Sequence, residues 1–420
     1  MRNIVKAMLL ATVGLMPIAA HADDTTTINW ALWDWDATAY YQPLIDAFEA
    51  KYPDIKVEHT DLGSSDYTTM LMTQLSGGGS DLDVVQVKDI PSYANMVRTN
   101  SLLPLGDDIK SAGIDTAAYG GLIEALTVDG NIYALPFRSD VWILYYNKDL
   151  FDAAGVDYPT NDMTWSEFAD KARALSSGFG ANKTYGALFH TWRSTVELPC
   201  IMDGQHTLDG GSYDFLKPCY DMVLGLQNDQ AVPSYASLKT TNTHYSGPFY
   251  NGTVAMLPMG SWFIGTQIAK VQSGESLAKN WGIARYPHMD GVEAGTTAAT
   301  ITSIGVAANS KHQDAALKFA NFVAGPEGAK VMAETGTLPA ISSDEVLAAI
   351  AAKDGFPQDD TSKGALKTVK SYLEMPVNLK AADIEVVLNR AHDSIMTDNI
   401  SVEDGLKEMN DGVQQVLNKN

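Results

Sequence analysis

Apolar and polar positions along the first third of the chain repeat with two periods, one typical of strands and one typical of helices. Residues 27–33 form a strand-like run, and residues 54–59 and 83–87 form two more. The first helical stripe between these runs is made by Tyr41, Leu44, Ile45 and Phe48. Strands that alternate with helices over short connections predict a parallel α/β sheet.

The stretch from Asn131 to Leu150 is read as two strand segments joined at Pro136. Residues 141–146 are six bulky residues bounded by polar ones, which is typical of a strand buried on both faces. A second set of elements follows, with a capping box at residues 164–167 and strands predicted at residues 252–257 and 301–307. We therefore expect two lobes, a first crossing near Pro136 and a second near Ile301.

The first 22 residues predict a secretory signal peptide. Two basic residues precede an apolar run at residues 7–20, and Ala20-His21-Ala22 is a small-x-small cleavage pattern. A membrane-spanning helix is disfavoured because the run is short and contains Gly14 and Pro17. We expect cleavage after Ala22 and export to the periplasm.

Charge and cysteine content fit an exported protein. The 420 residues include 29 Lys and Arg and 51 Asp and Glu, for a formal net charge of −22, and removing the two basic residues of the leader leaves −24. The negative electrostatic field of such a charge repels nucleic acid and disfavours it as a partner. Cys200 and Cys219 are the only cysteines, and an oxidising compartment favours their pairing, which would add about 3 kcal/mol of stability.

Catalytic and cofactor motifs are absent from the sequence. It has no nucleotide-binding loop, no G-x-S-x-G, no H-E-x-x-H, and its eight histidines lack ligand spacing. We therefore expect no cofactor and no metal. Pairs of Asp and Glu are frequent, so counting alone does not exclude a carboxylate pair for glycoside hydrolysis.

The strongest candidate site is the cluster Trp33, Asp34, Trp35 and Asp36, which follows the first strand. Ligands bind at the carboxyl ends of strands in open α/β sheets, indole faces stack on sugars or cations, and carboxylates accept hydrogen bonds. The alternative is that both tryptophans belong to the core. Lys88 and Asp89 lie at the end of the third strand, and Arg138 and Asp140 lie at the first crossing. Taken singly, each of these four is more often a solvated charge. Trp192, Arg193 and Glu197 lie in a polar segment before Cys200, where the disulfide is expected to brace a loop. Trp262 is expected to follow a strand and open a helix.

The chain resembles the extracellular solute-binding proteins of ABC importers, in the carbohydrate-binding family that includes the maltose-binding protein. The matching segments occur in family order over nearly the whole mature chain: residues 30–34 (WALWD), 48–57 (FEAKYPDIKV), 82–85 (LDVV), 130–136 (GNIYALP), 144–151 (LYYNKDLF), 164–168 (TWSEF), 249–256 (FYNGTVAM) and 260–262 (GSW). The first-strand loop departs from the maltose binder, which has small polar residues where this chain has an extra tryptophan.

The resemblance implies a type II periplasmic-binding-protein fold, with a ligand cleft between two α/β lobes of mostly parallel sheet. It implies an N-terminal lobe of residues 23–136 and 303–352 and a C-terminal lobe of residues 137–302 and 353–420. The family's ligand positions correspond here to residues 33–36, Asp89, Asp140, residues 192–197 and Trp262. The implied partners are an oligosaccharide and the membrane permease subunits of an importer, with the protein itself a monomer.

Two other functions stay open at this point. Tryptophan next to aspartate also suits a polyamine or another cationic solute. A secreted glycosidase would use the abundant carboxylates for hydrolysis instead of binding.

Overall fold

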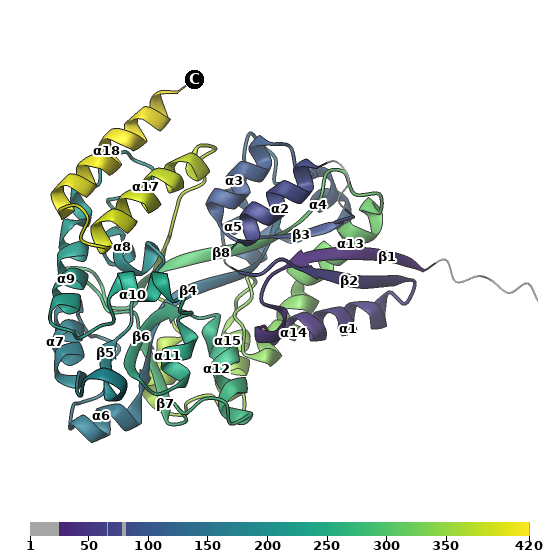
Figure 1. Ribbon diagram of the computed structural model, residues 1–420. Coiled ribbons are helices and arrows are strands. Elements are labelled where there is room, and N and C mark those ends of the chain that lie inside the picture. The colour runs from purple at the N-terminus through teal and green to yellow at the C-terminus, as the bar shows by residue number, and fades with distance from the viewer. Residues whose placement is uncertain (1–24, 65, 78–80, 420) are drawn as a thin grey trace, which may run out of the picture.

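The computed structural model describes residues 25–64, 66–77 and 81–419, so the predicted signal peptide and its cleavage site lie outside the described residues. The chain forms two halves joined by two long strands (Figure 1). These strands are β4 (Leu135–Asn147) and β8 (Thr296–Val306), which pair antiparallel and run from one half into the other. The other strands are β1 (Thr26–Leu32), β2 (Ile55–Asp61), β3 (Val84–Val87), β5 (Tyr185–Ala187), β6 (Val254–Gly260), β7 (Trp281–Arg285) and β9 (Lys370–Leu373).

The strands follow the order β2-β1-β3-β8-β4-β6-β5, with β7 on β4 and β9 on β8. The strands β2, β1 and β3 of the N-terminal half are parallel, as predicted. In the C-terminal half β5 pairs parallel with β6 and β8 pairs parallel with β9, whereas β4 pairs antiparallel with β6, β7 and β8. The expectation of a mostly parallel sheet therefore describes the first half better than the second.

The first crossing is one continuous strand, which corrects the prediction of two segments joined at Pro136. The strand β4 keeps its pairing with β8 through a register shift between Pro136 and Arg138. Proline has no N–H to donate to the ladder, and a bulge accommodates it without ending the strand. The second crossing is confirmed near Ile301, although β8 begins earlier, at Thr296.

The predicted helical stripe of the first half is confirmed, since all four of its apolar residues are buried in α1. This half contains α1 (Tyr41–Lys51), α2 (Tyr67–Ser76), α3 (Ile90–Arg98), α4 (Gly106–Ala112), α5 (Leu122–Ala125), α13 (Gln313–Ala324), α14 (Pro326–Thr335) and α15 (Asp344–Ala352). Two short 3-10 helices, η1 (Trp35–Ala37) and η2 (Thr116–Tyr119), complete it.

The capping box of the second half is also confirmed. Thr164 accepts from the backbone N–H of Glu167, whose carboxylate accepts from the backbone N–H of Thr164. The helices of this half are α6 (Lys148–Ala154), α7 (Trp165–Leu175), α8 (Ser194–Ile201), α9 (Lys217–Asn228), α10 (Tyr235–Thr240), α11 (Ser246–Tyr250), α12 (Phe263–Gln272), α16 (Asp360–Ala365), α17 (Ala381–Met396) and α18 (Val402–Asn418), with 3-10 turns η3 (Gly180–Asn182) and η4 (Asp214–Leu216).

The expected lobe boundaries at residues 136/137 and 302/303 fall inside β4 and β8, and the one at residues 352/353 falls at the end of α15. Helix α17 packs on α18 and also against α3 of the first half. Among the described residues, no helix combines the length and apolar character needed to cross a bilayer. The same part of the chain has no group of three or more His, Cys, Asp or Glu side chains placed to hold a metal ion.

Candidate functional site

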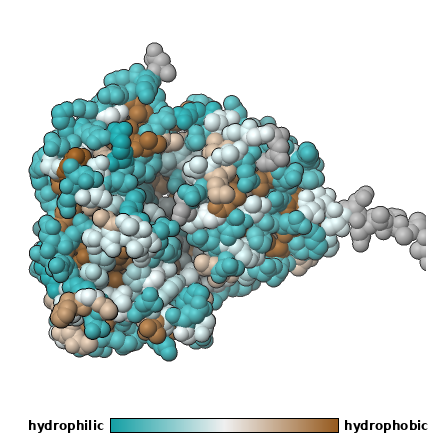
Figure 2. All heavy atoms as spheres, viewed as in Figure 1, coloured by the Kyte–Doolittle hydropathy of each residue, from teal (hydrophilic) through white to brown (hydrophobic). Residues whose placement is uncertain are grey.

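The candidates of the first half sit at the carboxyl ends of β1 and β3, and those of the second half follow β5 and β6. Figure 2 shows a hollow between the two halves, in front of the crossing strands. Because strand ends from both halves face this hollow, side chains distant in sequence can act on one bound molecule.

The two tryptophans of the β1 loop are held by the first half itself. Trp33 is buried edge-on against Tyr67, with ring centroids 4.8 Å apart. Trp35 is partly buried and stacks on His59, with centroids 3.6 Å apart and planes 9° apart. The alternative that both tryptophans belong to the core therefore holds for Trp33 but not for Trp35, which is only partly buried.

One carboxylate of this loop, that of Asp34, acts on the partly buried side chain of Lys88. Asp34 adopts a left-handed φ of 54° and is partly exposed, and Asp36 is exposed. The Lys88 ammonium lies 5.5 Å from the centroid of the Trp33 ring. Burial lowers the pKa of Lys88, while the carboxylates of Asp89 and Asp34 act to raise it. Asp89 is the N-cap of α3, where its carboxylate accepts a backbone N–H at 2.8 Å.

Arg138 and Asp140 form a buried ion pair inside β4. Arg138 Nε lies 2.7 Å from Asp140 Oδ2, Arg138 Nη1 donates to the Tyr40 hydroxyl at 2.8 Å, and Nη2 donates to Thr302 at 3.1 Å. The other oxygen of Asp140 accepts from Ser261 at 2.8 Å. Burial acts to lower the pKa of Arg138, but Asp140 raises it, and the net shift is upward. These groups tie β4 to β8 and β6, so we reassign them from direct ligand contacts to fixing the geometry of the crossing.

The wall of the second half is aromatic. The Trp262 ring lies 5.6 Å from Trp142 and 6.1 Å from Trp192, centroid to centroid, and its indole N–H donates to the Tyr245 hydroxyl at 3.1 Å. Trp192 and Trp262 are partly exposed. Gly260 makes this placement possible, because a Cβ there would lie 2.0 Å from the Trp262 ring. The prediction that Trp262 follows a strand and opens a helix is confirmed, since it is the N-cap of α12.

Two histidines complete this wall. His190, which follows β5, is 7% exposed and packs edge-on against Trp192 with centroids 4.6 Å apart. Burial is the main factor that lowers the pKa of His190 to about 3, so its imidazole is neutral at physiological pH. His244 lies 5.9 Å from His190, centroid to centroid. Burial lowers the pKa of His244 and Asp34 of the opposite half acts to raise it, so these two side chains are in electrostatic reach across the hollow.

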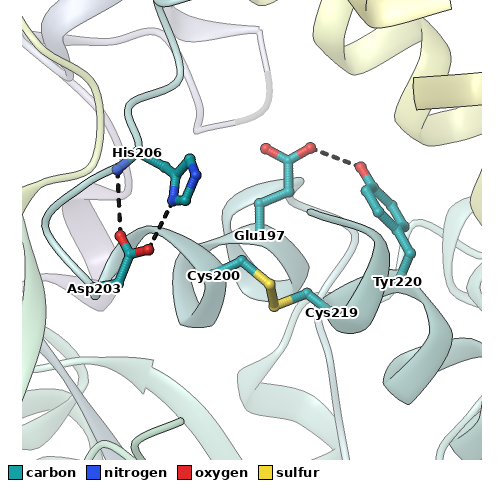
Figure 3. Close-up of a disulfide and its surroundings, with 6 residues drawn as sticks. All are labelled: Glu197, Cys200, Asp203, His206, Cys219 and Tyr220. Carbon is teal, nitrogen blue, oxygen red and sulfur yellow. Dashed lines mark hydrogen bonds and ion pairs between the residues drawn. A yellow bond between two sulfur atoms is a disulfide. The ribbon is translucent and has the colours of Figure 1, made fainter. Parts of the chain in front are cut away.

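Arg193 and Glu197 are corrected from ligand contacts to internal supports. Glu197 is fully buried and accepts from the Tyr220 hydroxyl at 2.7 Å (Figure 3). It also accepts from Arg193. Arg193 also pairs with Glu385 and donates to Asn389 at 3.2 Å, both on α17. With their polar atoms used inside the protein, these two residues hold α8 against α9 and α17.

The predicted disulfide between Cys200 and Cys219 is confirmed. It joins α8 to α9 (Figure 3). The segment it was expected to brace is the helix α8 and not a loop, so the bond fastens the helix that begins directly after Trp192 and Arg193.

The sequence did not single out His190, His244 and Tyr245 of the aromatic wall, or the buried Glu374. Glu374 accepts from Thr300 of β8 at 2.6 Å, and burial raises its pKa. None belongs to a motif. The one usable signal was that His190 directly follows a run of β-forming residues. A polar residue at the carboxyl end of a strand lies at the edge of the sheet where ligands bind.

The fold and the facing strand ends define a two-lobed binding protein. The chain belongs to the family of bacterial extracellular solute-binding proteins, whose model matches residues 34–330. It is similar to the lactose-binding protein of Rhizobium radiobacter, with 24% identity over 95% of this chain and 92% of that protein. It is also similar to the sn-glycerol-3-phosphate-binding periplasmic protein of Escherichia coli, with 25% identity over 77% of this chain and 76% of that one.

A solved structure is more similar in sequence. The crystal structure of a sugar transporter from Rhizobium etli in an open conformation is 63% identical, covers 93% of this chain and 99% of its own, and superposes with a TM-score of 0.77.

Proposed function

We propose that this protein is the substrate-binding component of an ABC-type sugar importer. It captures an oligosaccharide in the cleft between the lobes and delivers it to the membrane permease subunits. The observation that carries the proposal is the partly exposed aromatic wall of Trp192 and Trp262 opposite the polar strand ends of the first lobe. Aromatic faces stack on sugar rings, and the carboxylates opposite accept hydrogen bonds from hydroxyls.

A neutral sugar fits this cleft better than a cation. The Lys88 ammonium already lies over the ring of Trp33, which is the position that a ligand cation would take in a cation–π contact. Asp34 and Asp89 act on that ammonium, so part of their charge is balanced within the protein. A polyamine would have to compete with Lys88, which favours the sugar over the cationic alternative.

We propose a receptor and not a glycosidase. Hydrolysis needs one carboxylic acid and one carboxylate on opposite sides of a bound sugar. The buried carboxylates Asp140 and Glu197 are both used in ion pairs. The similar proteins from Rhizobium radiobacter and Rhizobium etli are a lactose-binding protein and a sugar transporter. The protein acts as an exported monomer in the periplasm, after removal of the leader behind Ala22.

A thermal-shift panel tests the proposal. The mature chain is mixed separately with lactose, maltose, maltotriose, mannobiose, D-mannitol, sn-glycerol 3-phosphate and spermidine. At a concentration of about 100 times Kd, a bound sugar adds about 2.7 kcal/mol of stability. Recovery of the sugar unchanged by mass spectrometry separates a receptor from a hydrolase. No shift with any sugar, a shift with spermidine alone, or cleavage of a sugar would refute the proposal.

A further inference from the structure

Direct contacts between the lobes bound the hollow on two opposite sides. On one side α3 packs against α17, and Arg98 Nη1 donates to Asp383 Oδ2 at 2.6 Å. On the other side Thr266 of α12 donates to the carbonyl oxygen of Ala37 at 3.1 Å. Figure 1 shows α3 meeting α17 above the crossing strands, and α12 with α14 and α15 below them.

The α12 side is closed by backbone as well as by side chains. A Cβ at Gly265 would lie 2.9 Å from the Thr335 carbonyl oxygen, and the Gly265 Cα lies within 3.5 Å of the position of a Cβ on Gly336. Glycine therefore allows this helix to approach the turn after α14 more closely than any other residue would. A ligand chain has no passage between two backbones in such contact.

Both end contacts involve helices that begin at candidate ligand residues. Asp89 begins α3, and Arg98 is the last residue of the same helix. Trp192 precedes Arg193, which is bound to α17, the helix that carries Asp383. At the opposite end Trp262 is the N-cap of α12, directly before the helix that carries Thr266. Trp262 thus begins one closing helix, and Trp192 precedes the arginine that binds the other.

We propose that these contacts close both ends of the cleft and restrict its ligand to a short oligosaccharide of two or three sugar units, with Arg98 and Asp383 forming one end stop. The inference rests on the proposed function and names its substrate class. Two neighbouring platforms, Trp192 and Trp262 with centroids 6.1 Å apart, provide stacking surface for adjacent sugar units. A longer chain would have to separate α3 from α17 before the lobes could adopt this arrangement.

Calorimetry with ladders of malto-, cello-, manno- and galacto-oligosaccharides, from monosaccharide to heptasaccharide, tests the length limit. In a ladder that binds, the disaccharide or trisaccharide has the lowest Kd, and the heptasaccharide binds at least tenfold more weakly. A heptasaccharide bound within twofold of the trisaccharide overturns the inference and leaves the proposed function standing. If no sugar of the ladders or of the panel binds, the proposed function fails and the inference fails with it.

Charge reversal tests the end stop itself. Asp383→Arg places like charges across the α3–α17 contact, and Arg98→Asp combined with Asp383→Arg restores opposite charges. We expect the single variant to lower the ratio of heptasaccharide to disaccharide Kd several-fold, and the swap to restore it. A merely structural role would change the Kd of both sugars equally, and that result would refute the end stop.

The matched control is a second exposed ion pair that involves α17. Arg390 Nε lies 2.7 Å from Glu408 of α18, and this pair joins two helices of the same lobe. Glu408→Arg makes the same kind of charge reversal and should leave the Kd ratio unchanged. Thermal unfolding of each free variant checks that it is folded. If Glu408→Arg lowers the ratio of heptasaccharide to disaccharide Kd as far as Asp383→Arg does, the effect is due to surface charge and the end stop is overturned.

Discussion

Replacing Trp262 by alanine should remove most of the sugar affinity while leaving a folded protein. The indole is partly exposed, contacts Trp142 and Trp192 edge-on or tilted, and makes one hydrogen bond to Tyr245. Loss of one aromatic face costs about 1–3 kcal/mol by analogy with base stacking, which is about a 5- to 150-fold rise in Kd. The stability cost should be below the roughly 3–5 kcal/mol of a fully buried aromatic side chain.

Isothermal titration calorimetry with the tightest sugar of the panel measures this effect. Trp262→Phe is the graded variant, because it keeps one aromatic ring but loses the second ring of the indole and the hydrogen bond to Tyr245, the latter worth about 1 kcal/mol. Phe179→Ala is the matched control, since Phe179 is 89% exposed and should change neither affinity nor stability. A Trp262→Ala protein that binds the sugar within twofold of the wild type would refute the assignment of Trp262 as a stacking platform.

Three further predictions concern stability, each measured by urea denaturation of the free protein. Replacing Cys200 and Cys219 by serine should lower the free energy of unfolding by about 3 kcal/mol, and an unchanged value would show that the bond does not constrain the unfolded chain. Arg193→Ala should cost about 3–5 kcal/mol because it leaves the Glu197 carboxylate buried without its cation, and a cost below about 1 kcal/mol would contradict that pairing. Because the pKa of His190 is lowered to about 3, the unfolded chain takes up a proton below about pH 6.5 while the folded chain does not. The contribution of His190 to the free energy of unfolding therefore falls toward acid by up to about 1.4 kcal/mol per pH unit. Between pH 7 and pH 5 the free energy of unfolding of His190→Phe should change less than that of the wild type, and an equal change would refute the lowered pKa of His190.

Local patterns carried the correct parts of the fold prediction. The stripe of α1 and the capping box of α7 depend on residues three and four positions apart, and the structure confirms both. The predicted break at Pro136 was wrong because a proline is compatible with both a turn and a β-bulge. Only the pairing of β4 with β8 distinguishes the two. The antiparallel pairing of β4 with β6 was likewise set by long-range register that periodicity does not encode.

The candidate site was predictable where a residue directly follows a strand. Trp262 and Lys88 lie at the strand ends that the sequence indicated. Arg193 and Glu197 were misread although their spacing of four on a helix is that of an ion pair, which was the available signal. Arg138 and Asp140 are two apart on a strand, so they share a face and pair with each other. Glu374 contacts Thr300 of β8 from 74 residues away in the chain, which no local pattern could indicate.

The most direct test of the central claim is a calorimetric titration of the mature protein with the panel sugars at low and at high salt, with the recovered ligand analysed by mass spectrometry. A neutral sugar brings no net charge to the cleft, so its affinity should vary little with ionic strength. One intact sugar should bind per chain at both salt concentrations. Binding of spermidine with an affinity that falls steeply as salt is added, or recovery of a cleaved sugar, would contradict it.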